Sequence, residues 1–253
     1  MIRWRKKAAP AIWEGVYERF ADVPVSGEGH RSQFWREELT KDVEYARSGD
    51  WQDEIVLDHE ALLFVLRHAR PQHVLDFGGG AGQSYAYVRR VWSAAAAPPL
   101  SKAEALPPHS ISRWTVVELP DVIVHGRTLF AGDDVIAFTD RPIPADLVFV
   151  KTALQYIDDW KGALRDLFAL GAPNVLLEKF SGIHGKSFVT SQLNLGASVV
   201  PYRFISFDEL FEVAESAGYR RVLWRRLPRI YDQSGFPPEL RMGQASTLIF
   251  AKP

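Results

Sequence analysis

Three glycines at alternate positions after an aspartate constrain this chain more than any other feature. They lie in LDFGGGAG, residues 75–82, between a short apolar stretch and a helical pattern that begins at Gln83. Because glycine lacks a Cβ atom, it can take positive φ and lets a ligand approach the backbone closely. The beginning of the helix then offers unpaired N–H groups. The stretch therefore predicts a strand, a turn and a helix that together bind a small ligand.

The spacing of these glycines distinguishes between ligands. A dinucleotide fingerprint has the form Gly-x-Gly-x-x-Gly or Ala, but the third position here is Gln83. The chain instead follows Asp-x-Gly-x-Gly-x-Gly, with Asp76, Gly78, Gly80 and Gly82. An acidic residue before the glycines suits a ligand with an amino group and a sulfonium, and suits a pyrophosphate poorly. The alternative is a glycine-rich turn that binds nothing, which an aspartate at a strand end makes the weaker interpretation.

This pattern resembles the first motif of class I S-adenosylmethionine-dependent methyltransferases. The resemblance implies an α/β fold with a doubly wound, seven-stranded and mostly parallel sheet, and S-adenosyl-L-methionine as the cofactor. The alternation of apolar strands with helices after residue 70 indicates the same fold class. The expected strands are 73–77, 114–118, 135–138, 146–150, 175–178, 221–224 and 247–251, and the expected helices are 83–95, 121–129, 160–170 and 207–217.

The part of the chain before the glycine motif has a different pattern. Residues 33–47 and 55–69 place apolar side chains at three- and four-residue steps, which predicts two helices. We therefore expect residues 1–70 to form an N-terminal helical extension or lid, and residues 71–253 to form the methyltransferase domain. The alanine- and proline-rich stretch 93–112 is expected to be a helix end followed by a surface loop.

Composition excludes several classes of function. The chain has 253 residues, and its 30 basic and 31 acidic residues give a net charge of −1. There is thus no electrostatic case for a nucleic-acid partner. No apolar run approaches the roughly 20 residues that span a bilayer, and the basic N-terminus lacks the apolar core of a signal peptide. We expect a cytoplasmic protein without membrane insertion. With no cysteine and no metal-spaced His/Asp/Glu cluster, no metal is expected.

Polar residues at the ends of three later strands are candidates for cofactor binding. Glu118 ends the second expected strand, where a carboxylate can accept from two ribose hydroxyls; the alternative is a surface glutamate. The resemblance implies that Asp140 meets the adenine amino group, although an aspartate before Pro142 is also typical of a turn. Lys151 ends the fourth strand, where it contacts the cofactor or simply covers the strand end.

The acceptor side of the site is expected just beyond the fourth and fifth strands. The resemblance places Gln155 and Tyr156 facing the methyl group, and Gln192 lies on a long crossing segment that can form a substrate wall. Tyr156, His184 and Asp158 are candidate general bases, in that order. A lone histidine such as His184 is more often a loop residue, and Asp158 is more often a helix cap.

The chain also resembles a narrower group of methyltransferases encoded in bacterial surface-polysaccharide gene clusters. This resemblance implies a small-molecule or glycan-related acceptor, with a sugar hydroxyl or amine as the methylated group. It rests on four stretches, residues 13–17, 75–82, 154–157, and 188–192 followed by 201–203.

Two rival functions remain open on the sequence. The first is a non-catalytic cofactor-binding protein that has a methyltransferase fold and is a partner of glycan-biosynthesis enzymes; the lack of an unambiguous general base favours it. The second is a nicotinamide-dependent oxidoreductase, which Gln83 in the glycine motif disfavours.

Overall fold

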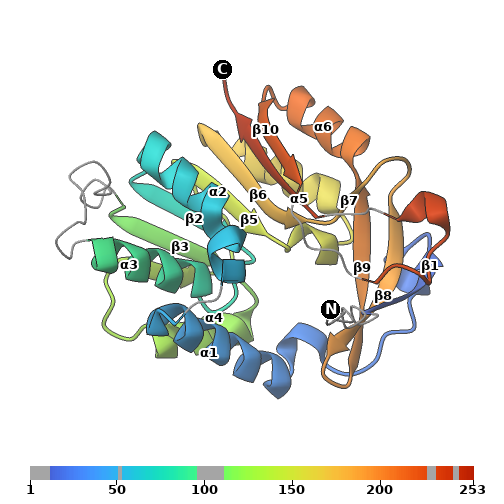
Figure 1. The fold of residues 1–253 in the computed structure, drawn as a ribbon, viewed down its shortest axis with the longest axis horizontal. Helices are drawn as coiled ribbons and strands as arrows, with labels where there is room; N and C mark the ends of the chain where they lie inside the picture. The colour runs from blue at the N-terminus through green and yellow to red at the C-terminus, as the bar shows by residue number, and fades with distance from the viewer. Residues whose placement is uncertain (1–11, 51–52, 96–110, 227–231, 242–244) are drawn as a thin grey trace, which may run out of the picture.

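The chain folds around two β-sheets, a large one and a small one. The computed structural model describes residues 12–50, 53–95, 111–226, 232–241 and 245–253. The large sheet has seven strands in the order β10-β11-β6-β5-β2-β3-β4 (Figure 1). Its strands are β2 (His73–Phe77), β3 (Arg113–Val117), β4 (Ile136–Thr139), β5 (Leu147–Lys151), β6 (Asn174–Phe180), β10 (Arg220–Arg226) and β11 (Ser246–Ala251).

The direction of these strands confirms the fold class expected from the sequence. Strands β2 to β6 are parallel to one another. Strand β11 runs antiparallel to β6, and β10 runs antiparallel to β11, so the terminal hairpin closes one edge of the sheet. The large sheet is therefore mostly parallel and seven-stranded, as expected.

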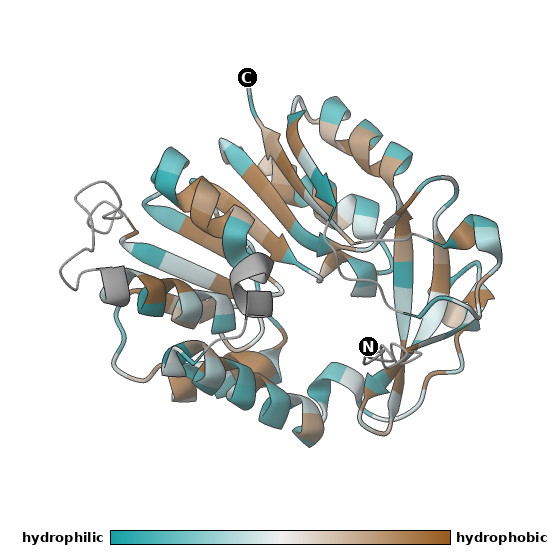
Figure 2. Cartoon of the chain, viewed as in Figure 1, coloured by the Kyte–Doolittle hydropathy of each residue, from teal (hydrophilic) through white to brown (hydrophobic). Residues whose placement is uncertain are grey.

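Side chains of the central strands alternate between two hydrophobic cores, as a pleated strand requires. In β5, Leu147 and Phe149 belong to one core while Val148 and Val150 belong to the other. Such strands are apolar on both sides, which explains why they read as continuous hydrophobic runs. Figure 2 shows these strands as mostly hydrophobic and the outer helices as mixed.

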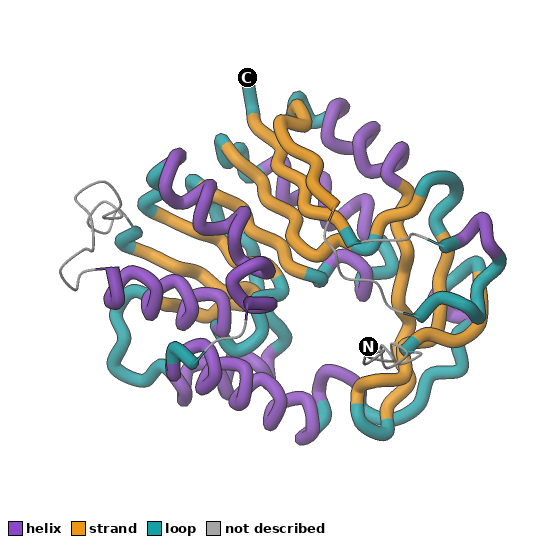
Figure 3. The backbone as a smooth tube through the Cα atoms, in the orientation of Figure 1, coloured by secondary structure: helices purple, strands orange, loops and turns teal. Residues whose placement is uncertain are grey.

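Helices cover the two faces of the large sheet (Figure 3). Helices α2, α3 and α4 contribute to the first core, and α1 joins that core as an outer layer on α3. Helices α5 and α6 contribute to the second core. Their bounds are α1 (Gln33–Ser48), α2 (Asp53–Ala69), α3 (Gln83–Ala95), α4 (Pro120–Leu129), α5 (Trp160–Ala169) and α6 (Phe207–Ser216).

The small sheet was not expected from the sequence. Its order is β1-β8-β9-β7, from β1 (Trp13–Tyr17), β7 (Gly182–Ile183), β8 (Phe188–Leu195) and β9 (Ser198–Ser206). Because β1 pairs with β8, the chain before residue 70 is not purely helical, and it shares a sheet with residues far downstream. The stretch 181–196, expected as a crossing segment, forms β7 and β8, and β8 pairs with β9 in an antiparallel hairpin.

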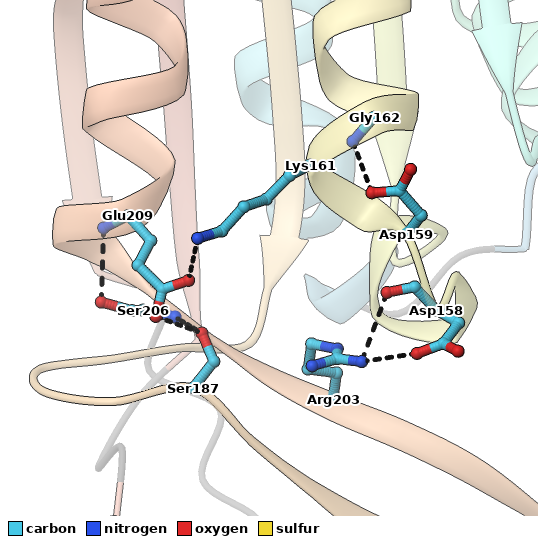
Figure 4. A network of polar contacts seen from close by, with 8 residues as sticks. All are labelled: Asp158, Asp159, Lys161, Gly162, Ser187, Arg203, Ser206 and Glu209. Carbon is cyan, nitrogen blue, oxygen red and sulfur yellow. Dashed lines mark hydrogen bonds and ion pairs between the residues drawn. The ribbon is translucent and has the colours of Figure 1, made fainter. Parts of the chain in front are cut away.

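A polar network fixes the small sheet to the helices of the large one (Figure 4). The Ser206 hydroxyl accepts from the Glu209 N–H and caps the beginning of α6. The Glu209 carboxylate does not complete a capping box. It contacts Lys161 of α5 at 2.7 Å and accepts from Ser187 at 3.2 Å.

A second contact in Figure 4 joins β9 to the turn before α5. Arg203 donates to the Asp158 carboxylate at 3.0 Å. Asp158, the third candidate base, is exposed and forms an ion pair with this arginine.

In the described part of the chain, no helix is long and apolar enough to cross a membrane. Of the alanine- and proline-rich stretch, residues 96–110 lie outside the described residues.

Candidate functional site

The carboxyl ends of the parallel strands point toward the small sheet (Figure 1), and a cavity of about 1010 Å³ lies there. Open α/β sheets bind ligands at this edge because the strand ends and the helix N-termini meet there. Most residues that the sequence indicated line this cavity. They are Asp76, Gly78, Gly80, Glu118, Asp140, Lys151, Tyr156 and Gln192.

The glycine turn between β2 and α3 requires glycine for both conformation and space. Gly78 has a φ of +69° and Gly80 a φ of +57°, in the left-handed region that favours glycine. A Cβ atom on Gly78 would overlap the Ala153 side chain, and one on Gly80 would come within 2.8 Å of the Leu39 Cδ2 atom. The two glycines therefore let the turn pack closely against Ala153 and Leu39 while it lines the cavity.

Asp76 is buried with part of its hydrogen-bonding capacity unused. Its Oδ2 atom accepts from the Trp114 indole N–H at 3.2 Å. Its Oδ1 atom is buried and has no hydrogen-bond partner among the described residues. Burial raises the pKa of Asp76 to about 7. A buried carboxylate oxygen without a partner is unfavourable unless a ligand supplies a donor, and a cationic donor is the most effective one.

Glu118 holds the glycine turn and the beginning of α4 together. One carboxylate oxygen accepts from the Gly80 N–H at 3.0 Å, and the other accepts from the Leu119 N–H at 2.8 Å. Burial raises the pKa of Glu118, and these two hydrogen bonds oppose that rise. Each oxygen keeps a second acceptor site, so the carboxylate can accept from two ligand hydroxyls without releasing the turn.

We expect Glu118→Ala to weaken binding of S-adenosylhomocysteine by roughly 1.5–3 kcal/mol, the range for hydrogen bonds to a charged group. The substitution removes both the contact with the ribose and the acceptor of the Gly80 N–H, so the glycine turn is held less firmly. Isothermal titration calorimetry measures it. Glu215→Ala, on the exposed side of α6 and outside the cavity, is the matched control. An unchanged dissociation constant for Glu118→Ala would place the ribose elsewhere.

Charged side chains from three elements form one wall of the cavity. The Lys151 Nζ atom, at the end of β5, lies 3.1 Å from the His59 Nε2 atom on α2. Asp42 of α1 lines the same wall. Burial raises the pKa of Asp42, while Lys151 and Lys179 lower it. The wall thus offers both signs of charge, as a zwitterionic ligand would need.

Uncharged polar groups and aromatic rings form the opposite end of the site. The Tyr156 hydroxyl donates to the Gln192 Oε1 atom at 2.8 Å, and the Gln192 amide donates to Asn194 at 2.6 Å. The Tyr202 hydroxyl donates to Ser181 at 2.6 Å. The two elements that the sequence pairs here, the segment after β5 and strand β8, do meet in space.

Besides Asp158, three candidate residues do not line the cavity. Gly82 lies against the hydrophobic core, where a Cβ atom would come within 2.8 Å of Ile136, so its role is to let α3 pack closely. Gln155 is buried beneath the cavity wall and does not line it. His184 is exposed on the connection from β7 to β8, where its ring packs near Phe207 and Trp224.

The structure adds cavity residues that the sequence gave no reason to select. His30 and Trp35 come from the segment that precedes and begins α1, and Trp13 comes from β1. Trp13 begins the stretch 13–17 on which the narrower resemblance rests, whereas His30 and Trp35 had no signal beyond their ring side chains. The described residues contain no group of three or more His, Asp or Glu side chains that could hold a metal ion.

Comparison with known proteins supports the fold. No family model matches the chain, and no curated protein matches it either. Among solved structures, an O-methyltransferase family protein from Burkholderia thailandensis aligns with a TM-score of 0.52 at 13% identity, over 92% of this chain and 66% of that one. A chain from the complex of the Haloferax volcanii Trm112 methyltransferase activator with a methyltransferase gives 0.53 at 16% identity, over 90% and 100%.

A third structure has the same arrangement. An S-adenosylmethionine-dependent methyltransferase from Clostridium acetobutylicum aligns with a TM-score of 0.50 at 8% identity, over 85% of this chain and 98% of the other. At such low identity these likenesses establish the fold and nothing finer. The chain thus has the fold of the class I methyltransferases, with its cavity at the edge where that fold binds ligands.

Proposed function

We propose that this protein is an S-adenosylmethionine-dependent methyltransferase of the cytoplasm that methylates an oxygen or nitrogen of a small-molecule or glycan-related acceptor. One observation carries the proposal. The unpartnered Asp76 oxygen, the bare glycine turn and the Glu118 carboxylate face a single cavity, and the Tyr156–Gln192 pair lines the same cavity. When bound, the cofactor supplies a methyl group on a positively charged sulfur.

The residues of the cavity fit this cofactor. Asp76 would accept from its ammonium group, and the turn at Gly78–Gly80 would let its chain pass close to the backbone. Glu118 would hold the ribose and Asp140 the adenine amino group. Lys151 would neutralise the carboxylate of the cofactor. Each of these assignments pairs a side chain of the cavity with a cofactor group of complementary chemistry.

The remaining space suits an acceptor of small size. Ligand cavities usually measure about 300–1,000 Å³, and the cavity volume of about 1010 Å³ allows a cofactor and a small acceptor together. The protein must hold the acceptor about 3–3.5 Å from the methyl carbon, in line with the bond that breaks. Tyr156 and Gln192 supply a hydroxyl and an amide, which suit a neutral hydroxylated molecule. The resemblance to polysaccharide-cluster methyltransferases points to the same class.

A non-catalytic cofactor-binding protein is the second candidate. Incubation with methyl-labelled cofactor and a panel of nucleotide sugars and lipid-linked glycans distinguishes the two. Transfer of label to a member of the panel supports the enzyme. Tight cofactor binding without transfer to any acceptor, including extracts of polar small molecules, favours the binding protein.

A further inference from the structure

We propose that His30 accepts the proton of the acceptor, and that the acceptor group is a hydroxyl, so that the reaction is O-methylation. The inference rests on the proposed function and adds to it a base and a class of acceptor group. Neither was evident from the sequence, where Tyr156, His184 and Asp158 were the candidate bases.

His30 is held from both sides by local structure. It is the middle residue of a 3-10 turn, η2 (Gly29–Arg31). The Gly29 N–H donates to the buried Ser198 hydroxyl at 3.0 Å, which fixes the turn on the β8–β9 hairpin. On the other side, the Ser32 hydroxyl accepts from the Trp35 N–H at 3.1 Å and begins α1. The imidazole therefore has a defined position between the small sheet and α1.

The ring of His30 lies against the acceptor end of the cavity. Its centroid lies 4.5 Å from that of Tyr156 and 5.1 Å from that of Trp35, both with edge-to-face geometry. It lines the cavity, and neither of its nitrogens has a hydrogen-bond partner among the described residues. Burial lowers the pKa of His30 to about 4, so at neutral pH the ring is uncharged and carries an available lone pair.

No other histidine of the described residues combines these properties. His59 also lines the cavity, but its Nε2 atom contacts Lys151 and Ser84. Three others contact protein atoms: His68 the Phe64 carbonyl, His73 Thr115 and His125 Thr40. His184 lies outside the cavity. The available lone pair of His30 is therefore a distinguishing feature of the site.

Tyr156 is placed to position the acceptor rather than to take its proton. Its hydroxyl proton is directed at the Gln192 oxygen, at 2.8 Å. The Tyr156 oxygen can therefore accept a hydrogen bond from the acceptor, but its own proton is already in use. Asn194 fixes the Gln192 amide in turn. This chain of amides orients the phenol, and the imidazole packs on the same ring.

Methyl transfer to a hydroxyl needs only the acceptor, the cofactor and a proton acceptor, and His30 provides the last. As the acceptor oxygen forms a bond to the methyl carbon, the carbon–sulfur bond breaks and sulfur keeps its electron pair as a thioether. The hydroxyl proton passes to the lone pair of His30, which becomes imidazolium and then releases the proton to solvent. An alcohol needs such a base because a protonated ether is a strong acid. A neutral amine attacks without one, so a base at this position indicates a hydroxyl acceptor.

The test uses His30→Asn and His30→Ala, with His184→Asn as the matched control outside the cavity. Turnover is followed with methyl-labelled cofactor and the most active member of the acceptor panel, and binding of S-adenosylhomocysteine is measured by calorimetry. We expect His30→Asn to lose about 10²- to 10⁴-fold in turnover, with the dissociation constant changed less than twofold. Free imidazole should restore part of the activity of His30→Ala, and His184→Asn should match the wild type.

A chemical measurement tests the availability of the ring without any acceptor. Diethylpyrocarbonate, with the modified residues located by mass spectrometry, should label His30 faster than His59, whose ring is engaged. An unlabelled His30, full turnover by His30→Asn, or a methyl group found on nitrogen would each overturn the inference. Failure of the wild type to bind the cofactor or its demethylated product is a different result, which contradicts the proposed function itself.

Discussion

Gly80→Val should abolish cofactor binding while the fold remains. The φ of Gly80 is +57°, where a β-branched residue is strongly disfavoured. Its Cβ atom would come within 2.8 Å of Leu39 and 2.7 Å of Gln83, so a valine would displace the turn that lines the cavity. We expect the dissociation constant for S-adenosylmethionine to rise at least 100-fold, which equals about 2.7 kcal/mol. Calorimetry on the purified variant measures this.

A matched variant at another glycine separates the steric effect of a valine at Gly80 from the cost of placing valine at positive φ. Gly171 also has positive φ, +75°, but nothing lies within 4 Å of its virtual Cβ atom and it does not line the cavity. Gly171→Val should therefore lose stability by about 1–3 kcal/mol through strain alone and bind the cofactor normally. Circular dichroism during urea denaturation gives the stability of both variants. Normal binding by Gly80→Val would mean that the ligand does not pass this turn.

Asp76→Asn should remove a pH dependence of cofactor affinity. The pKa of Asp76 is about 7 in the free protein because the side chain is fully buried. A cationic ligand binds the ionised form, so binding releases a proton. In the wild type, affinity should fall nearly tenfold for each pH unit below 7 and level off above 7. In Asp76→Asn this slope should disappear, and at pH 8 affinity should be at least 30-fold weaker, about 2 kcal/mol.

The same substitution should stabilise the protein without ligand. A carboxyl whose folded-state pKa lies above its ordinary value of 3.8 binds more protons in the folded than in the unfolded protein. Its contribution to stability is therefore lost as pH rises from about 4 to 7. Asp76→Asn avoids this loss, so it should unfold at higher temperature than the wild type at pH 8. Asp158→Asn, exposed and outside the cavity, is the control. A wild-type affinity that does not change between pH 5.5 and 8 would contradict the role of Asp76.

The large sheet could be predicted from the sequence because its signals are local. An apolar strand, a glycine turn and a helix follow one another within residues 73–95, and β5 is apolar on both sides. Ser206 caps the beginning of the last helix and Gly218, with positive φ, follows its end, and both are residue types that commonly bound helices. Since parallel strands all end at one edge, residues at those ends, such as Glu118 and Lys151, could be assigned to one site without knowing the strand order.

The small sheet could not be predicted, because β8, one of its two inner strands, does not alternate between polar and apolar residues. Thr190, Ser191 and Gln192 of β8 are all buried, since one face packs on neighbours and the other lines the cavity. Thr190 also donates to the Glu14 and Gly15 carbonyls, a contact between positions about 175 residues apart. Such pairing depends on the folded chain and leaves no local pattern.

The site residues that the sequence missed or misplaced also depend on how distant parts of the chain meet. His30 reaches the cavity only because its turn docks on the β8–β9 hairpin, so nothing near it in the sequence marks it. Gln155 and Tyr156 are neighbours in a 3-10 turn, η3 (Leu154–Tyr156). Successive residues of such a turn point in different directions, and only Tyr156 lines the cavity. The sequence could not indicate which of the two does so.

Calorimetric titration of the wild-type protein is the most direct test of whether the cavity binds S-adenosylmethionine rather than a dinucleotide. S-adenosylmethionine, S-adenosylhomocysteine and NAD are titrated separately at pH 8, where Asp76 is ionised. We expect the first two to bind with dissociation constants of about 1 μM, which corresponds to roughly 8 kcal/mol, and NAD to give no heat of binding. Binding of NAD without any response to the sulfonium compound or its demethylated product would contradict it.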